Sequence, residues 1–183
     1  MTQTNLMLGA AVLVSLCAAA TDARTGRIPN LLTLPTAVLG VALHGWFGGR
    51  AGAAASLMGL VVAGGIPWLL HRGTKGAGIG GGDVKLFAAL GALLGATVGL
   101  QLELLAFMLL AVYALVRLAF LGRLFRVLGN ALRLLVGPIL PAKLRRPLAT
   151  EALTEMRMGP AIAAAAVSVA LSDHVQRFVP WLG

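Results

Sequence analysis

Long apolar runs, separated by short polar or glycine-rich stretches, dominate the pattern of the chain. A helix that crosses a bilayer needs about 20 mostly apolar residues, and fewer where polar flanks reach back to the interface. Six runs approach that length, so the pattern predicts an all-α polytopic membrane protein with about six transmembrane helices. The expected helices cover approximately residues 6–20, 31–47, 51–70, 84–100, 102–121, and 159–172 or beyond.

Composition points to the same class of protein. Soluble domains carry about 25% charged residues, whereas 11% of this chain is charged and 58% is hydrophobic. We therefore expect a single membrane domain over residues 1–183, with no soluble domain. The run at 6–20 also has the length of a secretory signal, but "MTQTN" lacks the basic residues with which a signal begins. This favours a retained first helix, with the cleaved signal as the alternative.

The net charge of +9 raises the question of nucleic-acid binding. With the N-terminus outside, six crossings place residues 22–30, 71–83 and 122–158 on the cytoplasmic side. Those segments and the adjoining helix ends hold thirteen of the fifteen Lys and Arg residues. Such a bias is what the positive-inside rule describes. The charge is thus a topology signal, with attraction to anionic lipid as a secondary effect, and nucleic acid is not an expected partner.

The longest connection, residues 122–158, contains a basic amphipathic pattern. Its polar residues recur at helical spacing: Arg123, Arg126, Asn130 and Arg133. We expect a helix in the inner interface that ends before Pro138. Anchoring of the connection is the favoured role, and docking of a substrate is the alternative.

Two acidic residues fall at similar depth on the cytoplasmic side in this topology, which uses Lys and Arg alone. Asp22 lies where the first helix reaches the cytoplasm, and Asp83 lies where the fourth helix leaves it. Carboxylates at membrane depth are costly and often mark a site. The other four acids need no special explanation, since they fall in the polar connection or at predicted outer helix ends: Glu103, Glu151, Glu155 and Asp173.

Each of the two aspartates also has a simpler interpretation. Asp83 can be the N-cap of the helix that follows, although this leaves the preceding glycines of "GAGIGGGD" unexplained. Those glycines form either a flexible turn or an open backbone against which an extended peptide can lie. Asp22 ends a helix, where the dipole disfavours a negative charge, so capping does not explain it.

Two carboxyl groups that face one cavity can share a proton, because ionising both is costly. One can then act as a general base toward water and the other as a general acid toward a scissile amide. This chemistry requires no cofactor and no metal. The single Cys17 and the scattered histidines also give little support to a metal site or a Ser/His triad: His44, His71 and His174.

Three segments resemble a known family. "DARTGRIPN" (22–30), "GIGGGDVKLFAALGALLG" (79–96) and "MGPAIAAA" (158–165) are similar to the motifs of type IV prepilin peptidases, membrane aspartic proteases of the GxGD class. By this resemblance Asp22 and Asp83 are the catalytic pair. The resemblance also assigns supporting residues: Gly80, Gly82, Lys85, Pro29 and Asn30. For Lys85, snorkelling to the interface is favoured over participation in the site.

The resemblance further implies a substrate and a location. Pilin precursors carry a short basic leader before an apolar helix, so cleavage falls near the inner interface of the bacterial inner membrane, where pilus assembly or secretion machinery is the expected partner. The short chain is similar to the peptidases of tight-adherence (Flp-type) pilus systems, for which we expect neither methyltransferase activity nor zinc. Two other functions stay open: a small transporter that uses the same aspartates for ions or protons, and an inactive assembly factor.

Overall fold

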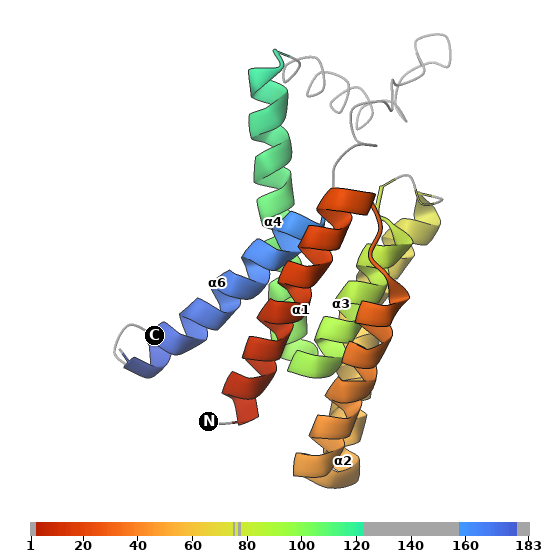
Figure 1. Cartoon of the computed structure of the whole chain (residues 1–183), viewed down its shortest axis with the longest axis vertical. Helices are drawn as coiled ribbons and strands as arrows, with labels where there is room; N and C mark the ends of the chain where they lie inside the picture. The colour runs from red at the N-terminus through yellow and green to blue at the C-terminus, as the bar shows by residue number, and fades with distance from the viewer. Residues whose placement is uncertain (1–2, 75, 77, 123–157, 179–183) are drawn as a thin grey trace, which may run out of the picture. The chain divides into compact units, whose positions relative to one another are not determined.

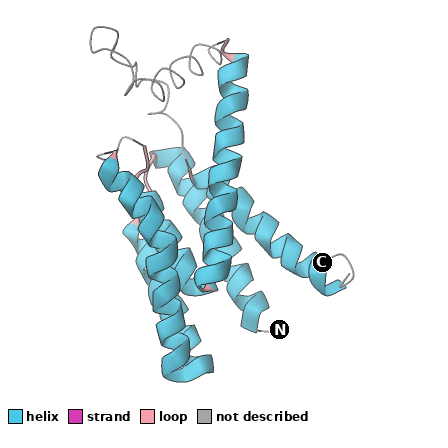
Figure 2. Cartoon of the chain, turned by 180° about the vertical axis from the view of Figure 1, so that it is seen from behind, coloured by secondary structure: helices cyan, strands magenta, loops and turns pink. Residues whose placement is uncertain are grey.

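The computed structural model describes residues 3–74, 76, 78–122 and 158–178, with the backbone alone at residue 3 and at 173–178. Within these residues the chain is all helical, as predicted, and short loops join the first four helices (Figure 2). They are α1 (Gln3–Thr25), α2 (Asn30–Gly73), α3 (Gly81–Leu94), α4 (Ala96–Phe120) and α6 (Gly159–Phe178), as labelled in Figure 1. The interfacial helix expected within 122–158 falls outside the described residues.

In the part of the chain that the structure describes, three helices are long and apolar enough to cross a membrane: Thr4–Thr25, Asn30–Gly73 and Ala96–Phe120. Gly159–Ser172 is a shorter apolar helix. Many large apolar side chains of these helices are exposed, Trp46 at 86% and Leu31 at 85% among them. An apolar surface of this extent suits contact with lipid.

Residue contacts divide the chain into two compact units, one of residues 1–109 with 157–183 and the other of residues 110–156. Helix α4 passes from the first unit into the second. Both candidate aspartates, Asp22 and Asp83, belong to the first unit. The single domain over residues 1–183 stays a prediction.

Helix α2 consists of two arms that meet at Gly49. The backbone there is not helical (φ 59°, ψ −147°), and a positive φ is a conformation that glycine adopts without a steric penalty. The arms fold back on each other, since a Cβ at Gly45 would lie 3.6 Å from the Cβ of Ala53. The bend falls in the gap between the apolar runs expected at 31–47 and 51–70.

The next break differs from the expected one. The runs at 84–100 and 102–121 imply a turn near residue 101, but the chain turns at Gly95, which has φ 82°. Helix α4 therefore contains Glu103 two turns from its start, and this side chain is 1% exposed rather than at an outer helix end. Both carboxylate oxygens of Glu103 lack a hydrogen-bond partner among the described residues.

Helix α3 is the core of the first unit. It is apolar on all sides, and most of its residues after the first turn are buried, as such a helix requires. Small residues bring the backbone of α2 against it from both arms: a Cβ at Gly40 would lie 2.6 Å from the carbonyl carbon of Ala92, and one at Gly64 would lie 2.7 Å from the Cβ of Ala88. Contacts this close leave α3 little freedom to shift.

The last carbonyls of α3 lack helical partners and are satisfied from α2. Ser56 Oγ donates to the carbonyl oxygen of Ala92 at 2.6 Å. His44 Nε2 lies 3.1 Å from the carbonyl oxygen of Leu93, and because a carbonyl only accepts, this nitrogen carries the proton. Each arm of α2 thus holds the C-terminal end of α3.

The substitution Gly91→Ala tests this packing. The new Cβ would overlap the carbonyl of Gly59 and lie 2.6 Å from the Cβ of Ala63, so we expect a loss of about 1–3 kcal/mol in stability. Thermal unfolding in detergent measures it. Gly65→Ala is the matched control, because a Cβ at Gly65 meets nothing within 4 Å. Equal unfolding temperatures for the two variants would contradict the packing described.

Candidate active site

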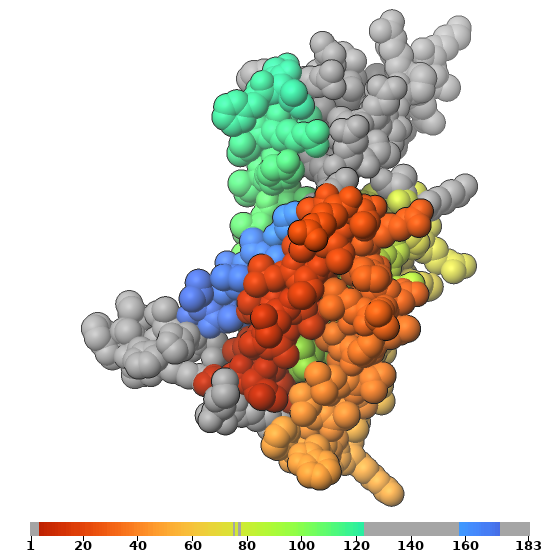
Figure 3. Space-filling view, in the orientation of Figure 1, coloured from red at the N-terminus to blue at the C-terminus, as the bar shows by residue number. Residues whose placement is uncertain are grey.

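Three helix ends meet at one end of the first unit: the C-terminus of α1 and the N-termini of α3 and α6 (Figure 1). Figure 3 shows α1 between α6 and α2 on one face. Helix α1 ends at Thr25, and Gly26 (φ 66°) caps it by donating its amide to the carbonyl oxygen of Asp22 at 2.9 Å. The aspartate itself therefore lies one turn inside the helix.

The Asp22 side chain is turned toward the start of α6. It is 7% exposed, and its Oδ2 accepts a hydrogen bond from the backbone amide of Gly159 at 3.1 Å. The first amides of a helix and its dipole both favour a negative charge at this position. The C-terminus of α1 disfavours the negative charge of Asp22, and the N-terminus of α6 offsets this effect. The position of an aspartate at the end of α1, which capping does not explain, is thus explained by α6.

Gly159 is in van der Waals contact with Asp22. A Cβ at this residue would lie 2.9 Å from both the Cβ and the Oδ2 of Asp22 and 3.1 Å from the Cα of Ala19. The sequence included Gly159 only as the start of the last helix. Its contact with an aspartate 137 residues earlier depends on tertiary structure.

Asp83 is the third residue of α3, and Gly80 occupies the N-cap position instead. The carbonyl oxygen of Gly80 accepts the amides of Asp83 at 3.1 Å and Val84 at 3.3 Å. The interpretation of Asp83 as an N-cap is therefore wrong. Its Oδ1 is buried with no hydrogen-bond partner in the described part of the chain.

The two aspartates act on each other electrostatically. Burial, and after it the charge of Asp22, raise the pKa of Asp83, amide hydrogen bonds from Gly80 and Asp83 itself lower it, and the net result is a pKa of about 6. Desolvation and a like charge both favour the neutral acid. Near pH 6 and below, Asp83 therefore keeps a proton beside Asp22.

The glycines before Asp83 leave space for two neighbours. A Cβ at Gly80 would lie 2.9 Å from Asp83 Oδ2. A Cβ at Gly82 would lie 3.1 Å from the Cβ of Ile28, a buried residue in the loop after α1. These glycines thus allow the loop that follows Asp22 to pack against the helix that carries Asp83.

The remaining residues assigned by resemblance lie at the start of α2 and in α3. Lys85 Nζ donates to Asn30 Oδ1 at 2.8 Å, a contact that joins the two signature segments. Pro29 directly precedes α2 with an extended backbone (φ −70°, ψ 141°), and its carbonyl oxygen accepts the amide of Leu32 at 3.0 Å. Proline therefore caps the helix rather than forming part of its first turn.

Among the residues that the structure describes, no group of three or more His, Cys, Asp and Glu side chains could hold a metal ion.

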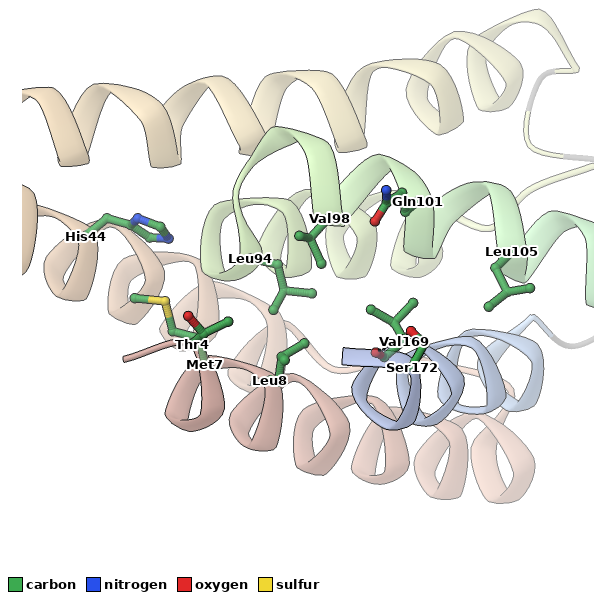
Figure 4. A pocket seen from close by; sticks show the side chains of 10 residues that line it. All are labelled: Thr4, Met7, Leu8, His44, Leu94, Val98, Gln101, Leu105, Val169 and Ser172. Atoms are coloured by element: carbon green, nitrogen blue, oxygen red, sulfur yellow. Dashed lines mark hydrogen bonds between the residues drawn. The ribbon is translucent and has the colours of Figure 1, made fainter. Parts of the chain in front are cut away.

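A cavity of about 690 Å³ lies away from the two aspartates, with Thr4, His44, Gln101 and Ser172 among its lining residues (Figure 4). Asp22 follows Thr4 by 18 positions in α1, which is about 27 Å along a helix. The cavity therefore does not belong to the carboxylate site.

The substitution Asp22→Asn is expected to lower the pKa of Asp83, because it removes the negative charge beside it. Desolvation remains, so the pKa should stay above 3.8. The infrared band of the protonated carboxyl, followed against pH, measures this, and its loss in Asp83→Asn assigns the band.

Because folding favours the protonated form, the contribution of Asp83 to stability falls as pH rises through about 6, and Asp22→Asn should reduce that fall. An unchanged titration would show that the two groups do not interact.

The substitution Gly159→Ala is expected to cost about 1–3 kcal/mol, since Asp22 or α6 must move to admit the methyl group. Thermal unfolding compares it with Gly9→Ala in α1, where a Cβ meets nothing within 4 Å. The contact is not as described if both variants unfold at the wild-type temperature.

Comparison with known proteins identifies the family. Residues 9–115, more than half of the chain and the part that contains both aspartates, match the type IV leader peptidase family. No curated protein and no solved structure matches the chain. With its apolar helices and this match, the chain belongs to the type IV leader peptidase family.

Proposed function

We propose that the protein is an aspartic endopeptidase that removes the leader peptide from type IV prepilins or pilin-like precursors at the cytoplasmic face of the bacterial inner membrane. Membership of the type IV leader peptidase family supports a protease of this class. The observation that carries the proposal is the unequal aspartate pair, in which the charge of Asp22 acts on the partly buried Asp83. An acid and a base side by side are what amide hydrolysis without a metal requires.

The surroundings suggest which aspartate takes which role. The Oδ2 of Asp22 already acts as a hydrogen-bond acceptor, toward the amide at the N-terminus of α6. The pKa of Asp83 is raised to about 6, so this carboxyl holds a proton more readily than an ordinary aspartate does. Asp22 is therefore the general base and Asp83 the general acid.

The proposed reaction conserves protons. Asp22 takes a proton from water as the water oxygen bonds to the scissile carbonyl carbon. Asp83 first donates a hydrogen bond to the carbonyl oxygen and then gives its proton to the amine as the C–N bond breaks. The cycle leaves Asp22 protonated and Asp83 ionised, and exchange with solvent restores both.

The open backbone before Asp83 supports a peptide substrate. Gly78 and Gly80 are exposed and have no side chains to obstruct a chain in extended form. The peptide bond to be cut would lie beyond them, at the carboxyl groups. An apolar helix after the cut would then extend along the membrane-facing surface of the enzyme.

Basic residues support the cytoplasmic orientation. Arg24 and Arg72 lie in the last turns of α1 and α2, at the same end of the first unit as the aspartates. Arg72 also stacks over the ring of Trp68, with its guanidinium carbon 5.5 Å from the ring centroid. Arginine and tryptophan are typical of a membrane interface, and the positive side faces the cytoplasm. With the two arms of α2 counted as separate crossings, we propose six crossings and an N-terminus outside.

The burial of Glu103 favours a second candidate function, a transporter of protons or cations. A buried carboxyl group without a partner among the described residues, inside a helix long enough to cross a membrane, is a common feature of proton pathways. Ion flux in proteoliposomes that depends on Glu103 would support it.

Cleavage of a tagged pilin precursor by the purified protein, followed by mass spectrometry, tests the peptidase. We expect one cut at the boundary between the basic leader and the apolar helix. Asp22→Asn and Asp83→Asn should each lower the rate by about 10²- to 10⁴-fold, the usual contribution of general acid–base catalysis.

Glu103→Gln is the matched control, because it makes the same carboxyl-to-amide change at a buried residue outside the pair. It should cleave at nearly the wild-type rate. If the folded wild-type protein cuts none of several precursors, the peptidase proposal fails, and flux through proteoliposomes then decides between a transporter and an assembly role.

A further inference from the structure

His71, in the last turn of α2, contacts the glycine-rich loop that leads to Asp83. Its Nδ1 lies 2.6 Å from the carbonyl oxygen of Ile79. Since a carbonyl only accepts, Nδ1 must carry the proton and donate. The neutral ring then has its lone pair on Nε2.

Two glycines, Gly76 and Gly81, also lie close to this imidazole ring. The amide of Gly76 donates to the carbonyl oxygen of His71 at 2.8 Å, and Gly76 has φ 82°. A Cβ at Gly76 would lie 3.3 Å from His71 Cε1, and one at Gly81 would lie 3.8 Å from the same atom. The ring thus touches the loop at its beginning and its end and bonds to it at Ile79.

This contact lies directly upstream of the candidate acid. Ile79 is 6% exposed, and the next residue is Gly80, whose carbonyl oxygen accepts the amide of Asp83. Fixing the Ile79 carbonyl therefore fixes the Ile79–Gly80 peptide unit, which leads directly into the N-cap of α3. A glycine-rich segment gains much from such a bond, because its backbone entropy is high and it has few side chains to pack. The amide of Gly78 also donates to Thr74 Oγ1, at 3.3 Å.

We propose that His71 is a positioning residue of the carboxylate site, whose Nδ1–H bond to Ile79 holds the glycine-rich loop so that Asp83 faces Asp22. Its effect on cleavage rests on the proposed peptidase function, whereas its effect on Asp83 does not. His71 acts through the loop and is not placed in contact with the substrate.

The chain offers a matched control in His44. This histidine is also in α2, is also partly buried, and also donates to a carbonyl of the α3 region, at Leu93. It holds the opposite end of α3 from Asp83. If His71 only stabilises the fold, loss of either histidine should have the same effect on the Asp83 titration and on unfolding. If His71 positions Asp83, only its loss should change the Asp83 titration.

The experiment compares His71→Leu, His71→Asn, His71→Gln and His44→Leu in the full-length protein. The readouts are the infrared titration of Asp83, thermal unfolding, and kcat and KM for cleavage. Asparagine places an amide nitrogen where Nδ1 stands, glutamine places it one bond farther out, and leucine removes the donor. The set separates the hydrogen bond from the bulk of the side chain.

His71→Leu and His71→Gln should shift the pKa of Asp83 from about 6 toward its ordinary value, as the loop loosens and water reaches the carboxyl. They should lower kcat on the order of 10²-fold, the cost of an error of about 1 Å in a catalytic group. KM should rise as well, because the same loop is the proposed peptide surface. His71→Asn should resemble the wild type. His44→Leu should lower the unfolding temperature and leave the Asp83 titration unchanged.

The proposal is overturned if His71→Leu leaves the titration of Asp83 unchanged, or if His44→Leu shifts it equally. Should His71→Leu not fold, the asparagine and glutamine variants decide, and equal behaviour of these two overturns it as well. A wild-type protein that fails to cleave any precursor would remove the peptidase function, but the titration would still decide the role of His71.

Discussion

The candidate site depends on the close backbone contact between α2 and α3. At Gly40, Gly59 and Gly64 the backbone of α2 lies directly against α3, so α3 is held by the arms of α2 at van der Waals distance. A contact made of backbone and small side chains permits few alternative packings, unlike one made of long flexible side chains. Asp83 lies in the first turn of α3, so the packing that fixes the position of α3 also fixes the backbone position of Asp83. A catalytic group needs such a rigid support, because small errors in its position are costly.

The electrostatics of the pair follow from three helix ends. Both aspartates lie near a helix N-terminus, which favours an anion in each case. Asp22 accepts a hydrogen bond from the amide of Gly159, while the C-terminus of its own helix, α1, disfavours its negative charge. At Asp83 the amides of Gly80 and Asp83 lower the pKa, but burial and the Asp22 charge outweigh them, and the result is a value of about 6. Two identical side chains thus have unequal surroundings, which is what the proposed roles of acid and base require.

Much of this arrangement could be predicted from the sequence, because the relevant signals are local. The apolar runs predict helices, and the distribution of Lys and Arg places Asp22 and Asp83 at one end without any use of the acids themselves. The bend at Gly49 follows from glycines between two apolar runs. By contrast, the turn at Gly95 lies within an uninterrupted apolar stretch, and the polar residues near 101 indicated a helix end where α4 in fact continues. Burial of Glu103 and the contact of Gly159 with Asp22 depend on which helices pack together, and no local pattern carries that information.

The two histidines of α2 show how a buried helix can be held at both ends inside a membrane protein. A helix has unpaired groups at its ends, and in an apolar environment each must find a partner in the protein. His44 donates through Nε2 to the last turn of α3, while His71 donates through Nδ1 to the loop before its first turn. Serine can reach only a neighbour in contact, as Ser56 does at Ala92, whereas imidazole spans a wider gap and offers a donor on either nitrogen. Hydrogen bonds to backbone carbonyls therefore explain histidines that the sequence alone left without a role.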